Sequence, residues 1–250
     1  MTVDVLAIGA HPDDVDMICG GTIAKLTAAG YRVAILDLTR GEMASRGTVA
    51  EREREAQAAA EVLGVCERTL LDLGDGRLEN NARNRQAVIE VARRLRPRLI
   101  LGHYWDDLHP DHCAAGEIVR AILYPMGFAN YPAAGEPFRP HEALFFMAHT
   151  PFVPSFIVDV EDHHERKLEA VRCFRSQFFR PPQDDGPPTG ISEPDFLQRL
   201  AARARHFGSL IGRSFGEPYI VTRAVPMEDP VAHYAPFAKL YSSRRWRETQ

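Results

Sequence analysis

Residues 3–14, VDVLAIGAHPDD, join a short apolar run to a polar cluster. The apolar run at 3–9 ends at a glycine and is too short for a helix, which predicts a buried strand. Similar runs at 31–38 and 98–103 predict two further strands. Helical spacing of apolar residues predicts helices at 20–29, at 50–63, before Pro97 and at 111–123. This alternation predicts a parallel sheet with helices on both faces.

The rest of the chain continues the alternation. Strands are expected at 143–148, 155–160 and 217–222, helices at 161–175 and 196–211, and a proline-rich loop at 180–188. No linker marks a second domain. We therefore predict one Rossmann-like α/β domain over residues 1–250, with an open, mostly parallel sheet.

The composition and charge of the chain argue against several classes of protein. The 250 residues include 30 basic and 34 acidic ones, for a net charge of −4, which gives no field that would attract nucleic acid or an anionic membrane. No apolar run approaches the ~20 residues of a membrane-spanning helix. The first residues do not resemble a signal peptide, and the four cysteines form no Cys-x-x-Cys pair. We expect a cytoplasmic enzyme with reduced thiols and a small-molecule substrate.

Two polar tetrapeptides follow predicted strands. The first is His11-Pro12-Asp13-Asp14, after the strand at 3–9, and the second is HPDH at 109–112, after the strand at 98–103. In a common doubly wound order the first and fourth strands are neighbours at the point where the connections reverse, so both clusters are expected at one crevice. Each tetrapeptide alone is also typical of a turn or a helix start; their joint placement favours a site.

The residue types predict a metal-dependent hydrolase. His11, Asp14 and His112 are the expected ligands, because two histidines and one carboxylate leave coordination positions open, as in catalytic zinc sites. The same donor set also fits Fe²⁺ in non-haem iron oxygenases, so Zn²⁺ is favoured without excluding Fe²⁺.

The remaining residues of the two clusters are expected to take part in catalysis. Asp13 is the predicted general base, taking a proton from water whose pKa the metal lowers. His109 is expected to stabilise the oxyanion in its protonated form, with Asp111 orienting it and holding that proton. The predicted reaction is hydrolysis of an amide.

The sequence gives less support to other cofactor-binding or catalytic sites. The chain has no Gly-x-Gly-x-x-Gly, P-loop or Gly-x-Ser-x-Gly motif. His103, His141 and His149 could line the crevice, and nothing in their spacing decides it. His163 and His164 lie among acidic residues, which predicts a solvated first helical turn.

The paired motifs AHPDD (10–14) and HPDH (109–112) resemble the signatures of the LmbE/PIG-L superfamily of zinc-dependent N-acetylglucosaminyl deacetylases. The segments LDLTRGE (36–42), RGT (46–48), SQF (176–178) and GEP (216–218) are similar to the bacillithiol-biosynthesis branch. The resemblance implies a Rossmann-like fold, a homo-oligomer, and an N-acetylated amino sugar as substrate, with N-acetylglucosaminyl-malate preferred. It also supports the metal, base and His109 assignments.

The resemblance further implies substrate-binding arginines. Arg52 and Arg139 match positions that face substrate in relatives, and Arg46 is a further candidate, since a guanidinium can bind sugar hydroxyls or carboxylates. Each could instead belong to a solvated ion pair. No tyrosine lies between Tyr131 and Tyr219, so oxyanion stabilisation is expected from the metal and His109. The alternatives are another N-acyl glycoside or thiol conjugate as substrate, an iron oxygenase, and a non-catalytic metal- or sugar-binding protein.

Overall fold

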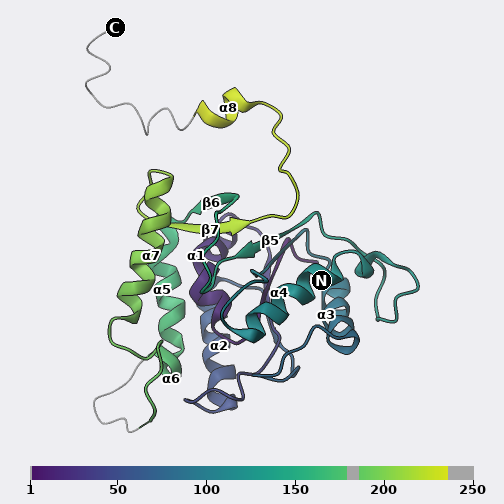
Figure 1. The fold of residues 1–250 in the computed structure, drawn as a ribbon, viewed down its shortest axis with the longest axis horizontal. Coiled ribbons are helices and arrows are strands. Elements are labelled where there is room, and N and C mark those ends of the chain that lie inside the picture. Colours follow the sequence, from purple (N-terminus) through teal and green to yellow (C-terminus); the bar gives the residue numbers. More distant parts are fainter. Residues whose placement is uncertain (1, 179–185, 236–250) are drawn as a thin grey trace. The chain divides into compact units, whose positions relative to one another are not determined.

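The computed structural model describes residues 2–178 and 186–235 (Figure 1). Its centre is a seven-stranded sheet of order β3-β2-β1-β4-β5-β7-β6. The strands from β3 to β5 are parallel, whereas β7 is antiparallel to both β5 and β6. This is the predicted open, mostly parallel sheet. The strands are β1 Val5–Gly9, β2 Val33–Asp37, β3 Glu67–Leu70, β4 Leu99–His103, β5 Glu142–Phe146, β6 Phe156–Asp159 and β7 Gly216–Ile220.

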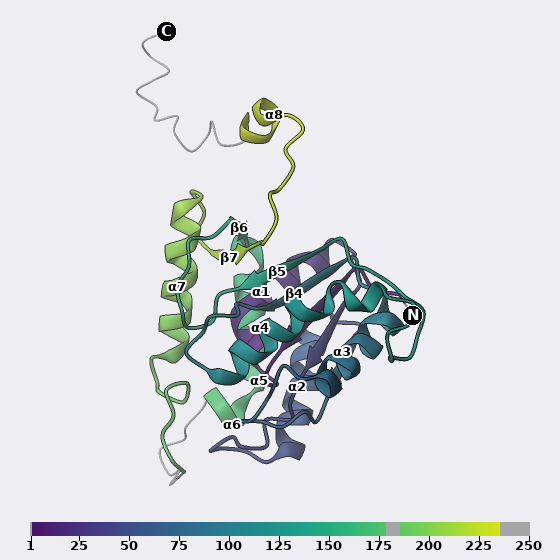
Figure 2. The same ribbon diagram turned by 45° about the vertical axis from the view of Figure 1, so that its right-hand side comes forward.

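Helices cover both faces of the sheet (Figure 2). Leu6 and Ile8 of β1 pack with α3 and α4, while Val5 and Ala7 pack with α1, α2 and α5. Because both faces are buried, the strand is a continuous apolar run rather than an alternating one. The helices are α1 Asp14–Ala28, α2 Val49–Leu63, α3 Ala82–Leu95, α4 Pro110–Ile122, α5 His164–Cys173, α6 Arg175–Phe178, α7 Phe196–Leu210 and α8 Pro230–Tyr234, with short 3-10 turns η1 Pro125–Gly127 and η2 Glu161–His163.

Local sequence explains where α2 and α3 begin and end. Thr48 and Glu51 form a capping box at the start of α2, and Gly64 ends it in the left-handed conformation at φ 73°. Asn81 caps α3, which ends at Leu95, before the proline that was expected to stop it. The helix over 50–63 is thereby confirmed.

β3 and α1 differ from the sequence prediction in ways that bear on the site. β3 was not predicted, because this short edge strand holds Glu67 and Arg68 instead of an apolar run. α1 begins at Asp14, earlier than the predicted residue 20, and its backbone leaves helical geometry at Cys19 (φ −122°, ψ 17°). The predicted helix therefore corresponds to the part of α1 after this break.

The sheet and the helices from α1 to α7 lie in the compact unit Met1–Ile220. A second unit, Val221–Gln250, contains α8, whose first turn is capped by Asp229. The single domain over 1–250 stays a prediction, and most of the proline-rich loop at 180–188 falls outside the described residues. Among the helices that the structure describes, none has the length and apolar character needed to cross a membrane.

Candidate active site

The two polar clusters meet at the carboxyl ends of β1 and β4, which are hydrogen-bonded neighbours. His11 and Asp14 follow β1, and His112 lies in the first turn of α4. The strand order thus brings the two clusters together, joining residues about one hundred positions apart. All three side chains are buried.

Asp14 lies between the two predicted histidine ligands. Its Oδ2 is 3.3 Å from Nδ1 of His11, and its Oδ1 is 3.2 Å from Nε2 of His112. The three ligand atoms lie within 4.8 Å of one another, a set that could hold a metal ion. The geometry therefore brings together the three residues predicted as ligands.

The outward nitrogen of each of these histidines meets another carboxylate. Nε2 of His11 lies 3.2 Å from both Asp75 and Asp111, and Nδ1 of His112 lies 3.0 Å from Asp107. In metalloproteins such carboxylates fix the tautomer and the orientation of ligating imidazoles. With the outer nitrogens protonated, Nδ1 of His11 and Nε2 of His112 are left to bind a metal, so the residues present fit one.

The charges around Asp14 favour its ionised form. Burial would raise the pKa of Asp14, but His112, His103 and His11 outweigh burial and hold it well below its usual value. Burial disfavours a charge on His112, yet Asp14 and Asp107 raise the pKa of His112 to about 9. The pKa of His11 is also raised, against burial, by Asp14 and its other acidic neighbours. Without a metal, protons on the two imidazoles offset part of the negative charge of the carboxylates.

His103, at the end of β4, lies behind the ligands. Its Nε2 is 3.1 Å from Asp14 and 3.2 Å from the backbone nitrogen of Ala10, and its ring stacks on His112 with centroids 4.1 Å apart. Burial, helped by the charge of His112, lowers the pKa of His103 to about 4, which favours the neutral ring. Of the three histidines left open by the sequence, His103 and His149 lie at the site, whereas His141 precedes β5, at the amino ends of the parallel strands.

Asp13, the predicted base, forms a buried ion pair with Arg52. Its Oδ2 lies 2.8 Å from Nη2 of Arg52, whose Nη1 donates to the carbonyl oxygen of Gly41. Arg52 comes from the first turn of α2, so the loop after β2 and this helix together position the base. The structure places Arg52 at the site, where its partner is Asp13; its contact with substrate stays a prediction.

The expected pairing of His109 with Asp111 is corrected by the structure. The Asp111 carboxylate accepts hydrogen bonds from the backbone of Gly76 and Leu78 and from His11, instead of orienting His109. The backbone N–H of Asp111 donates to Nδ1 of His109, since His109 caps α4. Burial and the charges of His11 and His112 lower the pKa of His109. His109 is therefore neutral, with its proton on Nε2.

The other two predicted arginines contact residues other than the metal ligands. Arg139 is exposed and sits over the rings of Tyr124 and Phe128, beyond the carboxyl end of α4, whereas the site lies at the amino end of that helix. Arg46 donates to the carbonyl oxygens of Ser176 and Pro187. Within this chain, Arg139 and the metal ligands are not brought together.

Sequence reasoning missed Asp75 and Asp107, and it left His149 undecided. Asp75 lies between Gly74 and Gly76, both at positive φ, in the turn after the unpredicted strand β3. Asp107 lies in the loop before α4, where an Asp-Asp pair two residues ahead of His109 was the available signal. Asp107 could have been identified from the sequence as a loop carboxylate next to a predicted ligand cluster.

The first part of α1, which carries Asp14, is held by a buried ion pair. Lys167 Nζ donates to the carbonyl oxygen of Ile18, before the break in the helix, and lies 2.7 Å from Glu217. Glu217 accepts hydrogen bonds from the backbone and hydroxyl of Thr22, after the break. The pair thus satisfies polar groups on both sides of the break and fixes the segment that carries a metal ligand.

Comparisons with known proteins identify the relatives of this chain. Residues 6–123 match the family model described as PIG-L, GlcNAc-PI de-N-acetylase. The chain is 34% identical to a diacetylchitobiose deacetylase of Thermococcus kodakarensis, over 94% of this chain and 86% of the relative. It is 33% identical to a probable N-acetyl-α-D-glucosaminyl L-malate deacetylase of Bacillus cereus, over 69% and 83%. The crystal structure of the conserved protein TT1542 from Thermus thermophilus aligns with a TM-score of 0.83 and 35% identity, over 92% and 98%.

Proposed function

The chain belongs to the PIG-L family of de-N-acetylases, which hydrolyse amides, and we propose that it removes the acetyl group of an N-acetylglucosaminyl compound with a bound zinc ion. The observation that carries the proposal is the position of Asp14 between the inner nitrogens of His11 and His112. Two histidines and one carboxylate leave room for water and substrate. When bound, the zinc ion would polarise the amide carbonyl and acidify water.

Asp13 is the proposed general base. It is adjacent to the ligand Asp14 in sequence, and its contact with Arg52 leaves Oδ1 for the attacking water. The carboxylate takes a proton as the water oxygen bonds to the amide carbon, and it returns that proton to the nitrogen as the C–N bond breaks. The products are a free amine and acetate.

His109 is the proposed donor to the oxyanion. Because its Nδ1 accepts a hydrogen bond from the backbone of Asp111, the proton of the neutral ring is on Nε2. A neutral imidazole donor in a buried site can stabilise a developing negative charge, as oxyanion-hole donors do. This role replaces the protonated histidine expected from the sequence.

The proposed substrate is N-acetylglucosaminyl-malate, with diacetylchitobiose as the second candidate. Similarity to the Bacillus cereus relative supports the first, and similarity to the Thermococcus kodakarensis relative supports the second. Arg52 is the predicted arginine that lies at the site, where a guanidinium could bind either a carboxylate or a sugar hydroxyl. Both compounds present the same acetamide to the metal ligands.

The test measures primary amine released from both compounds by zinc-loaded enzyme. We expect Asp13→Asn to retain zinc while turnover falls by about 10²-fold or more, because the amide cannot accept the proton. Asp72→Asn, an exposed aspartate after β3, is the matched control and should behave like wild type. Unchanged turnover in Asp13→Asn would refute the base assignment, and loss of zinc would make Asp13 a ligand.

The iron alternative is tested by oxygen dependence. An oxygenase needs O₂ and a reducing co-substrate, whereas a hydrolase needs neither. We expect amine release to continue under anaerobic conditions with zinc-loaded protein. Turnover that requires oxygen would refute amide hydrolysis at this site.

A further inference from the structure

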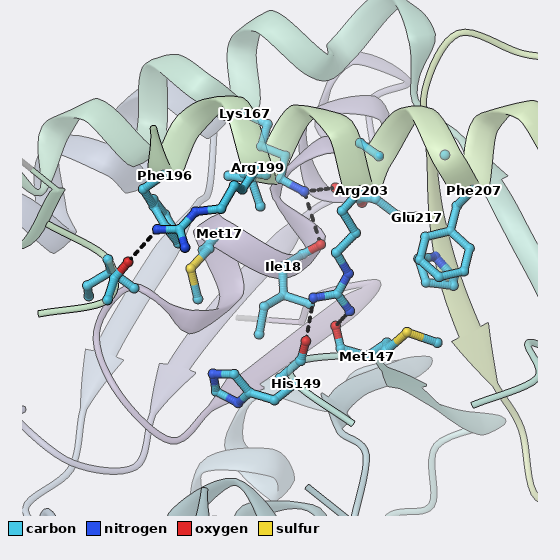
Figure 3. A pocket seen from close by; sticks show the side chains of 17 residues that line it. Met17, Ile18, Met147, His149, Lys167, Phe196, Arg199, Arg203, Phe207 and Glu217 are labelled. Carbon is cyan, nitrogen blue, oxygen red and sulfur yellow. Dashed lines mark hydrogen bonds and ion pairs between the residues drawn. The ribbon is translucent and has the colours of Figure 1, made fainter. Parts of the chain in front are cut away.

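A cavity of about 360 Å³ is lined by residues of α7, α1 and β7 (Figure 3). Most of its wall is apolar. The apolar side chains come from the first part of α1, from the segment after β5, and from α7, and they include Met17, Ile18, Met147, Phe196, Leu200 and Phe207.

The charged groups in the wall already have partners. Lys167 pairs with Glu217 at 2.7 Å. Arg203 donates to the carbonyl oxygens of Met147 and Ala148, and Figure 3 shows its guanidinium turned toward that segment. A ligand that placed a charge here would have to compete with these contacts, whereas an apolar group would cover the wall without disturbing them.

The cavity adjoins the site through His149. The ring of His149 lies in the cavity wall and stacks on the predicted ligand His112, with centroids 5.2 Å apart and planes 11° from parallel. Met17 and Ile18 of the wall lie in the same short helical segment as Asp14. His149 therefore both lines the cavity and contacts a predicted metal ligand, which connects the cavity to the site.

We infer that this cavity binds an apolar substituent of the substrate, such as an alkyl chain or an aromatic ring. The inference rests on the proposed deacetylation and extends its substrate range, because neither N-acetylglucosaminyl-malate nor diacetylchitobiose carries such a group. At ~30 Å³ for each water, its volume corresponds to about a dozen water molecules, enough for a chain of about six carbons. The apolar group could belong to the N-acyl chain or to the aglycone on the sugar.

Two series of substrates distinguish these sources. One compares methyl with hexyl glycosides of N-acetylglucosamine, and the other compares N-acetyl with N-hexanoyl glucosamine. We expect kcat/KM to rise at least tenfold with chain length in one series, since a single methylene in an apolar pocket gives about 10-fold or more. Hydrolysis of the short compounds without any chain-length effect in either series would overturn the inference and leave the proposed function intact.

Variants of α7 assign the effect to the cavity. Ala204 is buried in the wall, and Ala202, on the same helix, is exposed. Ala204→Phe fills the cavity and should bring the ratio of kcat/KM for long and short substrates close to one, whereas Ala202→Phe should keep the wild-type ratio. Leu200→Ala enlarges the cavity and should move the preference to a longer chain, which keeps the test open if Ala204→Phe does not fold.

Binding provides a readout that does not depend on turnover. If the aglycone occupies the cavity, calorimetry should show that hexyl N-acetylglucosaminide binds at least tenfold more tightly than the methyl glycoside. If the N-acyl chain occupies it, N-hexanoyl glucosamine should bind at least tenfold more tightly than the N-acetyl compound. A chain-length effect that survives unchanged in both Ala204→Phe and Leu200→Ala would overturn the assignment to this cavity. Tight binding without hydrolysis of any compound would support the cavity and refute the proposed function.

Discussion

Replacing Asp107 by asparagine tests whether the outer carboxylates control the metal ligands. Oδ1 of Asp107 accepts hydrogen bonds from Nδ1 of His112 (3.0 Å), from Nδ1 of His149 (2.8 Å) and from the backbone of His109 (3.1 Å). Oδ2 accepts from the backbone of His149 (2.7 Å) and Thr150 (3.1 Å). These bonds hold the pKa of Asp107 well below its usual value, although burial acts in the opposite direction. Asp107 therefore binds His112 as an anion.

The contacts allow the size of the effect to be worked out. Asparagine has one carbonyl oxygen, so one of the two groups of donors must face an NH₂ group. If the oxygen faces the imidazoles, two backbone N–H groups lose their acceptor at ~1–3 kcal/mol each, and the low end applies because His149 is half exposed. His112 also exchanges a charge-assisted hydrogen bond for a neutral one of about half the strength. We expect about 2 kcal/mol less stability and a ~10- to 100-fold weaker zinc affinity.

The assay is zinc competition with a chromophoric chelator, together with urea unfolding of the metal-free protein. Asp106→Asn is the matched control, because this exposed neighbour has the same charge and lies in the same loop. It should keep the wild-type affinity. A folded Asp107→Asn protein with zinc affinity within twofold of wild type would refute the view that this carboxylate orients His112.

Three further predictions concern charge and stability. Burial lowers the pKa of His164 to about 4, so its contribution to stability is complete above the unfolded pKa of about 6.5 and is lost as the pH falls toward 4. Between these pH values the free energy of unfolding, measured in urea, should fall by roughly 3 kcal/mol less in His164→Phe than in wild type. His163→Phe should follow wild type. Arg68→Met leaves the buried Asp16 and Asp37 without their cation and should cost about 3–5 kcal/mol, more at pH 8 than at pH 5, and a loss below 1 kcal/mol would contradict this. Chelation should abolish deacetylation, and zinc at 100 times its Kd should restore it and add about 2.7 kcal/mol of stability, seen as a higher Tm.

The fold could be predicted where burial leaves a trace in the sequence. β1 is enclosed by helices on both faces, so its residues form the apolar run that predicted it. β3 lies at the edge of the sheet, and its central residue Arg68 is buried by ion pairs with Asp16 and Asp37 from other elements. A charged residue in a strand becomes favourable through partners that are distant in sequence, and hydrophobic periodicity does not report them.

The site, like the fold, could be predicted where short sequence motifs report it. The proximity of His11, Asp14 and His112 could be predicted because each lies in a short motif after a strand, and the strand order brings the motifs together. The pairing of His109 was misjudged, because proximity in sequence suggested a carboxylate partner where helix geometry supplies a backbone N–H. His164 was expected in a solvated turn, yet it is buried against Phe215. The acidic neighbours of His164 in sequence do not describe its neighbours in space.

The charge balance of the site gives a physical reason for a divalent cation. Asp75, Asp107 and Asp111 surround the outer nitrogens of the two histidines, while Asp14 lies between their inner nitrogens. Buried carboxylates are unfavourable unless they are paired, and in the metal-free protein the raised pKa values of both histidines offset part of the negative charge with two protons. A metal would displace the protons of the inner nitrogens, because the N–H groups of the outer nitrogens are hydrogen-bonded to the outer carboxylates. A dication bound between these nitrogens would supply the same two positive charges at the point where Asp14 already lies, so it would replace the two protons without a change in the total charge of the site.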